Sequence, residues 1–142
     1  MPQLINSFRG EFFFLSNFYP VVIWNAGICY PSAEHAYQAA KTFNQAERLA
    51  IASLDKSGQA KRAGRIVTLR PDWEQVKLSV MESIVRKKFS LTSLAQKLVN
   101  TLPAQLVEGN TWGDRYWGVC NGVGANHLGK ILMKVRKDLM DV

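Results

Sequence analysis

Residues 106–118 read LVEGNTWGDRYWG and constrain this chain more than any other stretch. Leu106 and Val107 are typical of the end of a short buried strand, and carboxylates, aromatic rings and glycines follow directly. Glycine lets a backbone turn sharply and approach a ligand closely, and Trp faces stack bases, sugars or cations. The stretch therefore indicates one of two structures. One is a pocket for a flat ring, in which Glu108 and Asp114 handle protons; the other is an aromatic loop that packs on the core, since turns also favour Gly, Asn and Asp.

The length of 142 residues fits one domain of ordinary size, which we expect to span 1–142. With 47% hydrophobic and 20% charged residues, the chain can build a core. The first residues lack a basic segment followed by an apolar run, and no run is long and apolar enough to cross a membrane. We therefore expect a cytoplasmic protein without a membrane partner.

The formal net charge of +7 favours anionic partners, which are nucleotides, phosphates or nucleic acid, without choosing among them. Two cysteines far apart in sequence, Cys29 and Cys120, make a weak case for a disulfide. His35 and His127 form no recognisable pair of zinc ligands with them. We expect no structural metal and no cofactor.

The pattern of apolar residues predicts a mostly helical α+β domain with a small β-sheet. Residues 3–30 are rich in aromatic and β-branched side chains and predict two or three short strands with a turn at 25–27. The remainder predicts helices, with Ser32, Asn44 and Thr92 as N-caps. These helices are expected at 31–43, 44–54, 59–64, 71–89, 92–100 and 124–140.

The helix predicted at 31–43 places Glu34, Gln38 and Lys41 on one side. Glu34 and Lys41 would lie two turns, or about 10 Å, apart. This side is either an exposed polar stripe or an acid and an amine along one wall of a cleft. Carboxylates, a lysine and aromatic rings suit cleavage of a glycosidic bond, because a carboxylate stabilises positive charge at the anomeric carbon and a second acid protonates the leaving group. A lysine can instead attack the sugar carbon and form a Schiff base.

Five segments, in this order and with this spacing, resemble the NADAR (YbiA-like) family. They read FFFLSNFYP, YPSAEHAYQAAKTF, AKRAGR, LVEGNTWGDRYWG and GVGANHLGKILMKVR. The combination of an S-x-E-H-x-x-Q-A-x-K helix with a later D-x-x-W-G and G-x-N-x-L-G segment is specific, and the resemblance covers about residues 8–139.

The resemblance implies an α+β fold dominated by helices and an N-glycosidase activity that cleaves a bond between ribose and nitrogen. It implies two substrate classes: phosphoribosylamino-pyrimidine intermediates of riboflavin synthesis, and ADP-ribose attached to guanine in nucleic acid. The expected partner is thus a nucleotide-like small molecule or ADP-ribosylated nucleic acid.

The resemblance also implies roles for individual residues. Lys41 would attack the ribose to form a Schiff base, Glu34 or Asp114 would transfer protons, and Glu108 would help to position the substrate. His35 is expected to be a satisfied core residue rather than a catalytic one. The residues expected to bind phosphate, ribose and base are Arg9, Asn17, Phe18, Arg65, Trp112, Trp117 and Asn126.

Two non-enzymatic interpretations compete with this hypothesis. One is a module that binds nucleotides or nucleic acid through its charge and aromatic rings. The other is a domain that binds ADP-ribose without cleaving it. Binding that depends steeply on salt without turnover would favour the first, and tight binding with intact ligand would favour the second.

Overall fold

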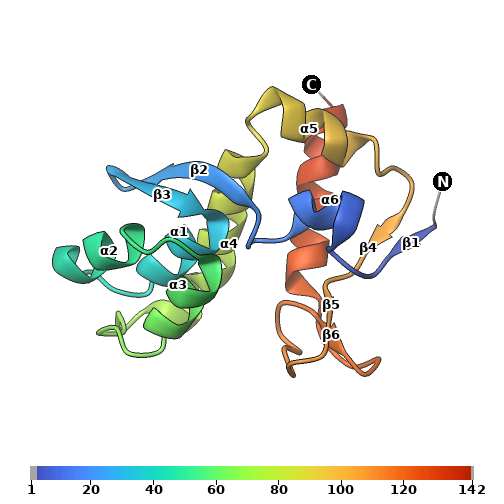
Figure 1. The fold of residues 1–142 in the computed structure, drawn as a ribbon. Helices are drawn as coiled ribbons and strands as arrows, with labels where there is room; N and C mark the ends of the chain where they lie inside the picture. The colour runs from blue at the N-terminus through green and yellow to red at the C-terminus, as the bar shows by residue number, and fades with distance from the viewer. Residues whose placement is uncertain (1–2, 142) are drawn as a thin grey trace. The chain divides into compact units, whose positions relative to one another are not determined.

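The computed structural model describes residues 3–141. They form two compact units, one of Asn17–Lys88 and the other of the segment up to Ser16 together with residues from Phe89 onward. Helices dominate both units and the strands are short, which confirms the predicted mostly helical α+β class (Figure 1). Within residues 3–141, no helix combines the length and the apolar character that a membrane span requires.

The Asn17–Lys88 unit begins with a β-hairpin. Strand β2 (Pro20–Asn25) pairs antiparallel with β3 (Ile28–Ser32), with Trp24 opposite Cys29. Ala26 and Gly27 make the turn with positive φ angles of 51° and 80°, the left-handed region that glycine adopts easily. The turn predicted at 25–27 is therefore confirmed.

Helix α1 (Ala33–Ala39) follows β3 directly and is the most enclosed element of this unit. Ser32 caps it, because its hydroxyl accepts a hydrogen bond from the backbone N–H of His35 at 3.1 Å. Every residue of α1 is buried, since the helix packs against the hairpin and against three further helices. Those helices are α2 (Gln45–Ala52), α3 (Ser57–Ala63) and α4 (Trp73–Lys88).

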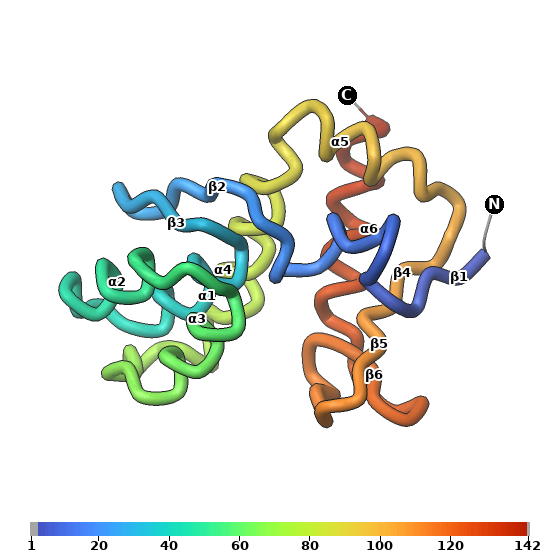
Figure 2. The backbone as a smooth tube through the Cα atoms, viewed as in Figure 1, coloured from blue at the N-terminus to red at the C-terminus, as the bar shows by residue number. Residues whose placement is uncertain are grey.

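The second unit joins the two ends of the described chain. Strand β1 (Leu4–Ile5) lies parallel to β4 (Gln105–Leu106), so blue and orange segments of the tube run side by side in Figure 2. Helix α6 (His127–Met140) packs against α5 (Thr92–Val99) and β4, and its apolar face fills the core with leucines that are at most 1% exposed, such as Leu128 and Leu132. The other elements are η1 (Gly10–Leu15), β5 (Gly109–Asn110) and β6 (Val119–Cys120).

Several predicted boundaries were wrong. The helix predicted at 31–43 ends at Ala39, so Lys41 lies in the turn that follows it. Thr92 is the first residue of α5 rather than its cap, a position that Leu91 takes without a side-chain hydrogen bond. The last helix begins only at His127, because Asn126 adopts a left-handed φ of 55° that no α-helix continues.

A buried lysine makes the stability of the fold depend on pH. Lys88 is 1% exposed, and burial lowers the pKa of its amine from 10.5 to about 7. Between about pH 7 and pH 10, the unfolded chain therefore binds more protons than the folded chain, and the free energy of unfolding rises with pH. We expect a gain of about 2 kcal/mol from pH 7 to pH 9, measured by urea unfolding. Lys88→Met should lack this gain, and an equal gain in that variant would contradict the assignment.

Candidate functional site

Lys41 lies in the turn that follows α1. Its side chain is half-buried, and its Nζ lies 5.6 Å from the centroid of the Tyr37 ring, one turn back along the helix. This distance is within the range of a cation–π contact. The amine therefore folds back over α1 and does not extend into bulk water.

The surroundings of Lys41 lower the pKa of its amine. Burial is the largest cause, and the cationic side chains of Arg65 and Lys77 lower the pKa further, while the Glu34 carboxylate raises it in part. Burial disfavours the charged ammonium, and nearby cations repel it. A neutral amine is therefore present at a lower pH than for an ordinary lysine, which is what an attacking nitrogen needs.

Glu34 is the carboxylate that accompanies this amine. It lies in the first turn of α1, is 8% exposed, and donates its backbone N–H to the Asn17 carbonyl at 3.0 Å. Its Oε2 accepts a hydrogen bond of 2.6 Å from Gln38 Nε2. The exposed polar stripe considered from the sequence is therefore wrong for Glu34 and Gln38, and the side of α1 that carries them is buried.

Gln38 supports the carboxylate through a tightly packed amide. The side chain is 5% exposed, and its Oε1 has no hydrogen-bond partner among residues 3–141. A methyl group on Gly64 would overlap this amide, so the glycine leaves the space that the Gln38 side chain occupies. Gln38 and Gly64 thus fix the direction from which Glu34 receives its hydrogen bond.

His35 is a satisfied core residue, as predicted. It is 1% exposed, its Nδ1 lies 2.6 Å from Ser32 Oγ, and its Nε2 lies 2.9 Å from the Leu54 carbonyl oxygen. The carbonyl can only accept, so Nε2 donates, and Nδ1 accepts from the serine. Burial lowers the pKa of His35, while the bond to Leu54 raises it in part. Both ring nitrogens are occupied, which leaves His35 a structural role.

Three of the predicted substrate-binding residues belong to the same unit as Lys41. Asn17 is buried, and its Nδ2 lies 3.4 Å from Met81 Sδ, so its side chain faces α4. Phe18 exposes 37% of its surface, and Arg65 is exposed in the turn after α3. Of the three, Phe18 and Arg65 remain accessible to a ligand.

Asp114 belongs to the second unit and organises the loop between β5 and β6. Its Oδ1 accepts from the backbone N–H groups of Tyr116 at 3.1 Å and Trp117 at 2.9 Å. Asn110 holds the backbone of Asp114 on both sides, with its Nδ2 2.8 Å from the Asp114 carbonyl and its Oδ1 3.0 Å from the Asp114 N–H. The carboxylate is partly exposed, with its second oxygen outside these two bonds.

The same loop caps the N-terminus of α6. The first N–H groups of a helix have no partner within it. Here His127 N donates to the Tyr116 carbonyl at 3.1 Å, and Leu128 N donates to the Trp117 carbonyl at 2.9 Å. The Tyr116 ring contacts the Trp117 ring edge-on at 4.8 Å between centroids and the His127 ring at 4.5 Å. The sequence leaves open whether this aromatic stretch forms a ligand pocket or packs as a loop. At Tyr116 and Trp117 the stretch packs, because the Tyr116 ring contacts the rings of Trp117 and His127.

Asn126 connects α6 to the strand before it. Its Nδ2 donates to the Leu106 carbonyl at 3.0 Å, and its Oδ1 accepts from the Glu108 N–H at 3.0 Å. Both polar ends of the amide are therefore occupied by backbone, which gives Asn126 a structural role in this unit. Glu108 itself is partly buried.

Trp112 and Arg9 are the exposed members of the predicted set in this unit. Trp112 leaves 54% of its surface exposed beside Gly113, whose φ of 86° turns the loop. Arg9 is exposed at the start of η1. Among the described residues, no group of three or more His, Cys, Asp or Glu side chains lies where it could hold a metal ion.

Sequence reasoning missed several residues that the structure places around these side chains. Asn110 had a local signal, because it stands four positions before Asp114 within 106–118. Lys77 and Arg70 lie about thirty positions or more beyond Lys41, and Gly64 follows α3, so no local pattern links them to α1. Only the packing of α3 and α4 on α1 brings them close to it.

Two variants of Asp114 separate its loop contacts from proton transfer. Asp114→Asn keeps an oxygen that accepts from Tyr116 and Trp117 but cannot transfer a proton as a carboxylic acid does. If Asp114 transfers protons, Asn and Ala should both lower kcat about a hundredfold or more, while only Ala should also lower Tm. Full kcat in Asp114→Asn, measured beside its thermal unfolding, would assign Asp114 to the loop alone.

Comparison with known proteins identifies relatives over nearly the whole chain. Residues 6–140 match the NADAR domain. The chain is 39% identical over 132 residues to the riboflavin biosynthesis protein VVA0006 of Vibrio vulnificus. The matched residues make up 90% of this chain but only 36% of that protein. It is 39% identical over 128 residues to N-glycosidase YbiA of Escherichia coli, covering 87% of this chain and 79% of YbiA.

Two further similarities extend this result. N-glycosidase Npun_R5314 of Nostoc punctiforme is 35% identical over 134 residues, which cover 89% of this chain and 85% of that protein. The NMR structure of Escherichia coli YbiA matches with a TM-score of 0.86 at 35% identity, over 99% of this chain and 88% of that one.

Proposed function

Because this chain belongs to the NADAR family, we propose that it is an N-glycosidase that cleaves the bond between a ribose carbon and a nitrogen. The observation that carries the proposal is Lys41, a half-buried amine with a lowered pKa whose charge interacts with the buried Glu34 carboxylate. An amine in this state can attack a sugar carbon, and a carboxylate beside it can transfer the protons.

The proposed reaction balances with these two side chains and one water. The Lys41 ammonium first gives a proton to the Glu34 carboxylate. The neutral Nζ then attacks ribose C1′ while the bond from C1′ to the base breaks, and the leaving nitrogen takes that proton from the Glu34 carboxylic acid. The attacking nitrogen returns a proton to Glu34. The bond from C1′ to the ring oxygen then breaks, that oxygen takes the proton, and a protonated imine forms between C1′ and Nζ. Water adds to the imine carbon, which releases the sugar and restores the lysine.

Phosphate groups on the ribose suit the charges around this amine. Arg65 and Lys77 are near enough to lower the pKa of Lys41, and guanidinium and ammonium groups bind phosphate. The net charge of +7 acts in the same direction at longer range. We propose the two substrate classes that the family resemblance implies. One is phosphoribosylamino-pyrimidines, which agrees with the name of the riboflavin biosynthesis relative, and the other is ADP-ribose on guanine in nucleic acid.

The remaining assignments follow the family resemblance. We propose that residues 1–142 act as one N-glycosidase domain in the cytoplasm. Phe18 and Arg65 are the accessible candidates for substrate contact beside Lys41, and Trp112, Trp117 and Arg9 remain predicted substrate-binding residues. Asn17 and Asn126 were predicted in the same role, but their buried amides face Met81 and the backbone of Leu106 and Glu108. Asp114 and Glu108 remain candidate carboxylates, and the two Asp114 variants test the first of them.

One experiment tests the function and selects the substrate. The purified protein is incubated in parallel with ADP-ribosylated guanine DNA and with a phosphoribosylamino-pyrimidine, and mass spectrometry follows the products. We expect a free base or amine and a free sugar phosphate from at least one of them, and borohydride should trap a sugar on Lys41 during that reaction. Tight binding with both substrates intact would replace this function with that of a binding module.

A further inference from the structure

Three consecutive carbonyl groups around Lys41 are held by side chains and backbone from elsewhere in the same unit. The Ala40 carbonyl accepts from Arg70 Nη1 at 3.4 Å, and the Lys41 carbonyl accepts from the Arg70 backbone N–H at 2.7 Å. The Thr42 carbonyl accepts from Arg48 Nε at 2.7 Å. The carbonyls at a helix end lack partners within the helix, so these donors replace the next turn that α1 does not form.

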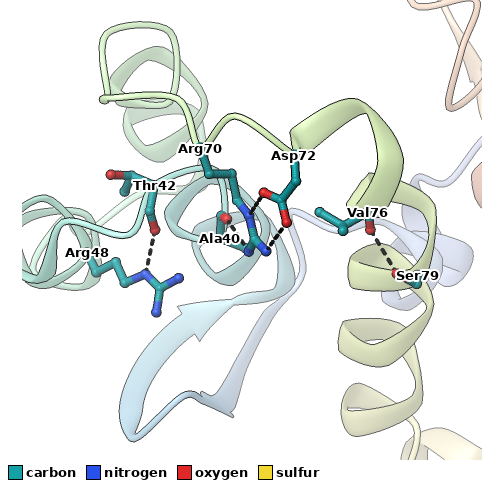
Figure 3. A network of polar contacts seen from close by, with 7 residues as sticks. All are labelled: Ala40, Thr42, Arg48, Arg70, Asp72, Val76 and Ser79. Carbon is teal, nitrogen blue, oxygen red and sulfur yellow. Dashed lines mark hydrogen bonds and ion pairs between the residues drawn. The ribbon is translucent and has the colours of Figure 1, made fainter.

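The guanidinium of Arg70 is itself held in place. Its Nε and Nη2 bind the two carboxylate oxygens of Asp72 at 2.6 Å and 2.9 Å, and its other side faces the Ala40 carbonyl (Figure 3). Its central carbon lies 4.3 Å from the centroid of the Phe43 ring, which is stacking distance. A planar group fixed by a paired carboxylate and a ring has few orientations left.

A second connection joins the same two segments. The Thr42 hydroxyl donates to Glu47 Oε1 at 2.6 Å, and the Glu47 carboxylate also accepts from the Thr68 N–H at 3.0 Å and 3.1 Å. The residues that flank Lys41 are thus tied to the segment that carries Thr68 and Arg70 in two ways: the Ala40 carbonyl binds Arg70 directly, and the Thr42 hydroxyl is connected to Thr68 through Glu47. The backbone that carries the Lys41 side chain is fixed at residues before and after it.

We propose that Arg70 is a positioning residue, which fixes the turn of Ala40–Thr42 so that the Lys41 amine is held where it attacks. This inference rests on the proposed function, because it assigns the attack to Lys41. A lysine side chain has four rotatable bonds, and loss of a fixed starting point spreads its nitrogen over many positions. Displacement of a reacting atom by about 1 Å lowers a rate by up to about a hundredfold.

The test compares Arg70→Met with a matched control. Methionine keeps an unbranched apolar side chain at position 70 but removes the guanidinium, and with it the contacts to Asp72, the Ala40 carbonyl and the Phe43 ring, while the backbone N–H still binds the Lys41 carbonyl. Arg86→Met is the control, since it also removes a guanidinium from this unit, and Arg86 pairs with Glu82 at 3.0 Å within α4. We expect Arg70→Met to lower kcat about tenfold to a hundredfold, with KM changed less than about threefold and a Tm within about 3 °C of the control. Arg70→Lys should recover part of kcat, because it restores a cation but not the two-point pairing.

A second readout does not depend on cleavage of an N-glycoside. Ribose 5-phosphate and borohydride are added, and the rate at which the sugar is trapped on Lys41 is measured by peptide mass spectrometry. Arg70→Met should slow this trapping by a factor similar to its loss in kcat, and Arg86→Met should not. Trapping at the wild-type rate in Arg70→Met would overturn the positioning role while leaving the proposed function standing. Full turnover by Lys41→Ala would overturn both.

Discussion

Lys41→Ala should lower kcat at least about a thousandfold, the order expected when the nucleophile of a covalent reaction is removed. The physical reason is that the half-buried amine with its lowered pKa supplies the attacking nitrogen, and Ala offers none. The fold should survive, because the Lys41 carbonyl that binds the Arg70 N–H at 2.7 Å belongs to the backbone and remains. The measurement is steady-state turnover of the substrate identified by mass spectrometry, beside circular dichroism.

The control for this variant is another lysine of the same unit. Lys61 lies in the last turn of α3 and is partly exposed. Lys61→Ala removes the same positive charge from the protein, so a loss of activity caused by net charge alone would appear in both variants. We expect Lys61→Ala to keep kcat within about threefold of wild type. A Lys41→Ala enzyme as active as Lys61→Ala would exclude the Schiff-base mechanism.

The parts of this unit that depend on local chemistry could be predicted from the sequence. Ser32 and Asn44 both cap their helices as expected, because a cap needs only a short polar side chain and the N–H groups two or three residues ahead. The turn at 25–27 was equally local. The class of fold followed from the pattern of apolar residues, and helix spacing placed Glu34 and Lys41 on one side. The family resemblance then selected the catalytic interpretation of these two residues over an exposed polar stripe.

The parts that depend on distant contacts could not be predicted. Helix propensity alone predicts that α1 continues past Ala39. In the structure, Arg70 binds the carbonyls of Ala40 and Lys41 instead. The sequence near residue 40 contains no signal that predicts this contact. Periodicity placed Glu34 and Gln38 on one side of α1 without showing that the elements packed around α1 bury that side. The late start of α6 has the same cause, since Asn126 leaves helical geometry to bind Leu106 and Glu108.

Gly129→Ala should destabilise the second unit by about 3 kcal/mol or more, the upper range for an overpacked core site. Gly129 is a buried residue in the first turn of α6, and helix propensity alone would favour alanine there by about 1 kcal/mol. The added methyl group would overlap the Leu106 carbonyl and the Asn126 side chain. Space therefore opposes propensity, and the overlap falls on the two groups that already share a hydrogen bond of 3.0 Å.

Lys130, the next residue along α6, provides the control for Gly129→Ala. Lys130 is exposed on the same helix, so Lys130→Ala adds no contact and should change stability by less than about 0.5 kcal/mol. Urea unfolding of both variants gives the comparison. A Gly129→Ala protein as stable as wild type would mean that α6 can move away from β4 at little cost. A large loss would instead show that the Asn126 amide, bonded to Leu106 and Glu108, holds α6 against that strand too closely for one additional carbon atom.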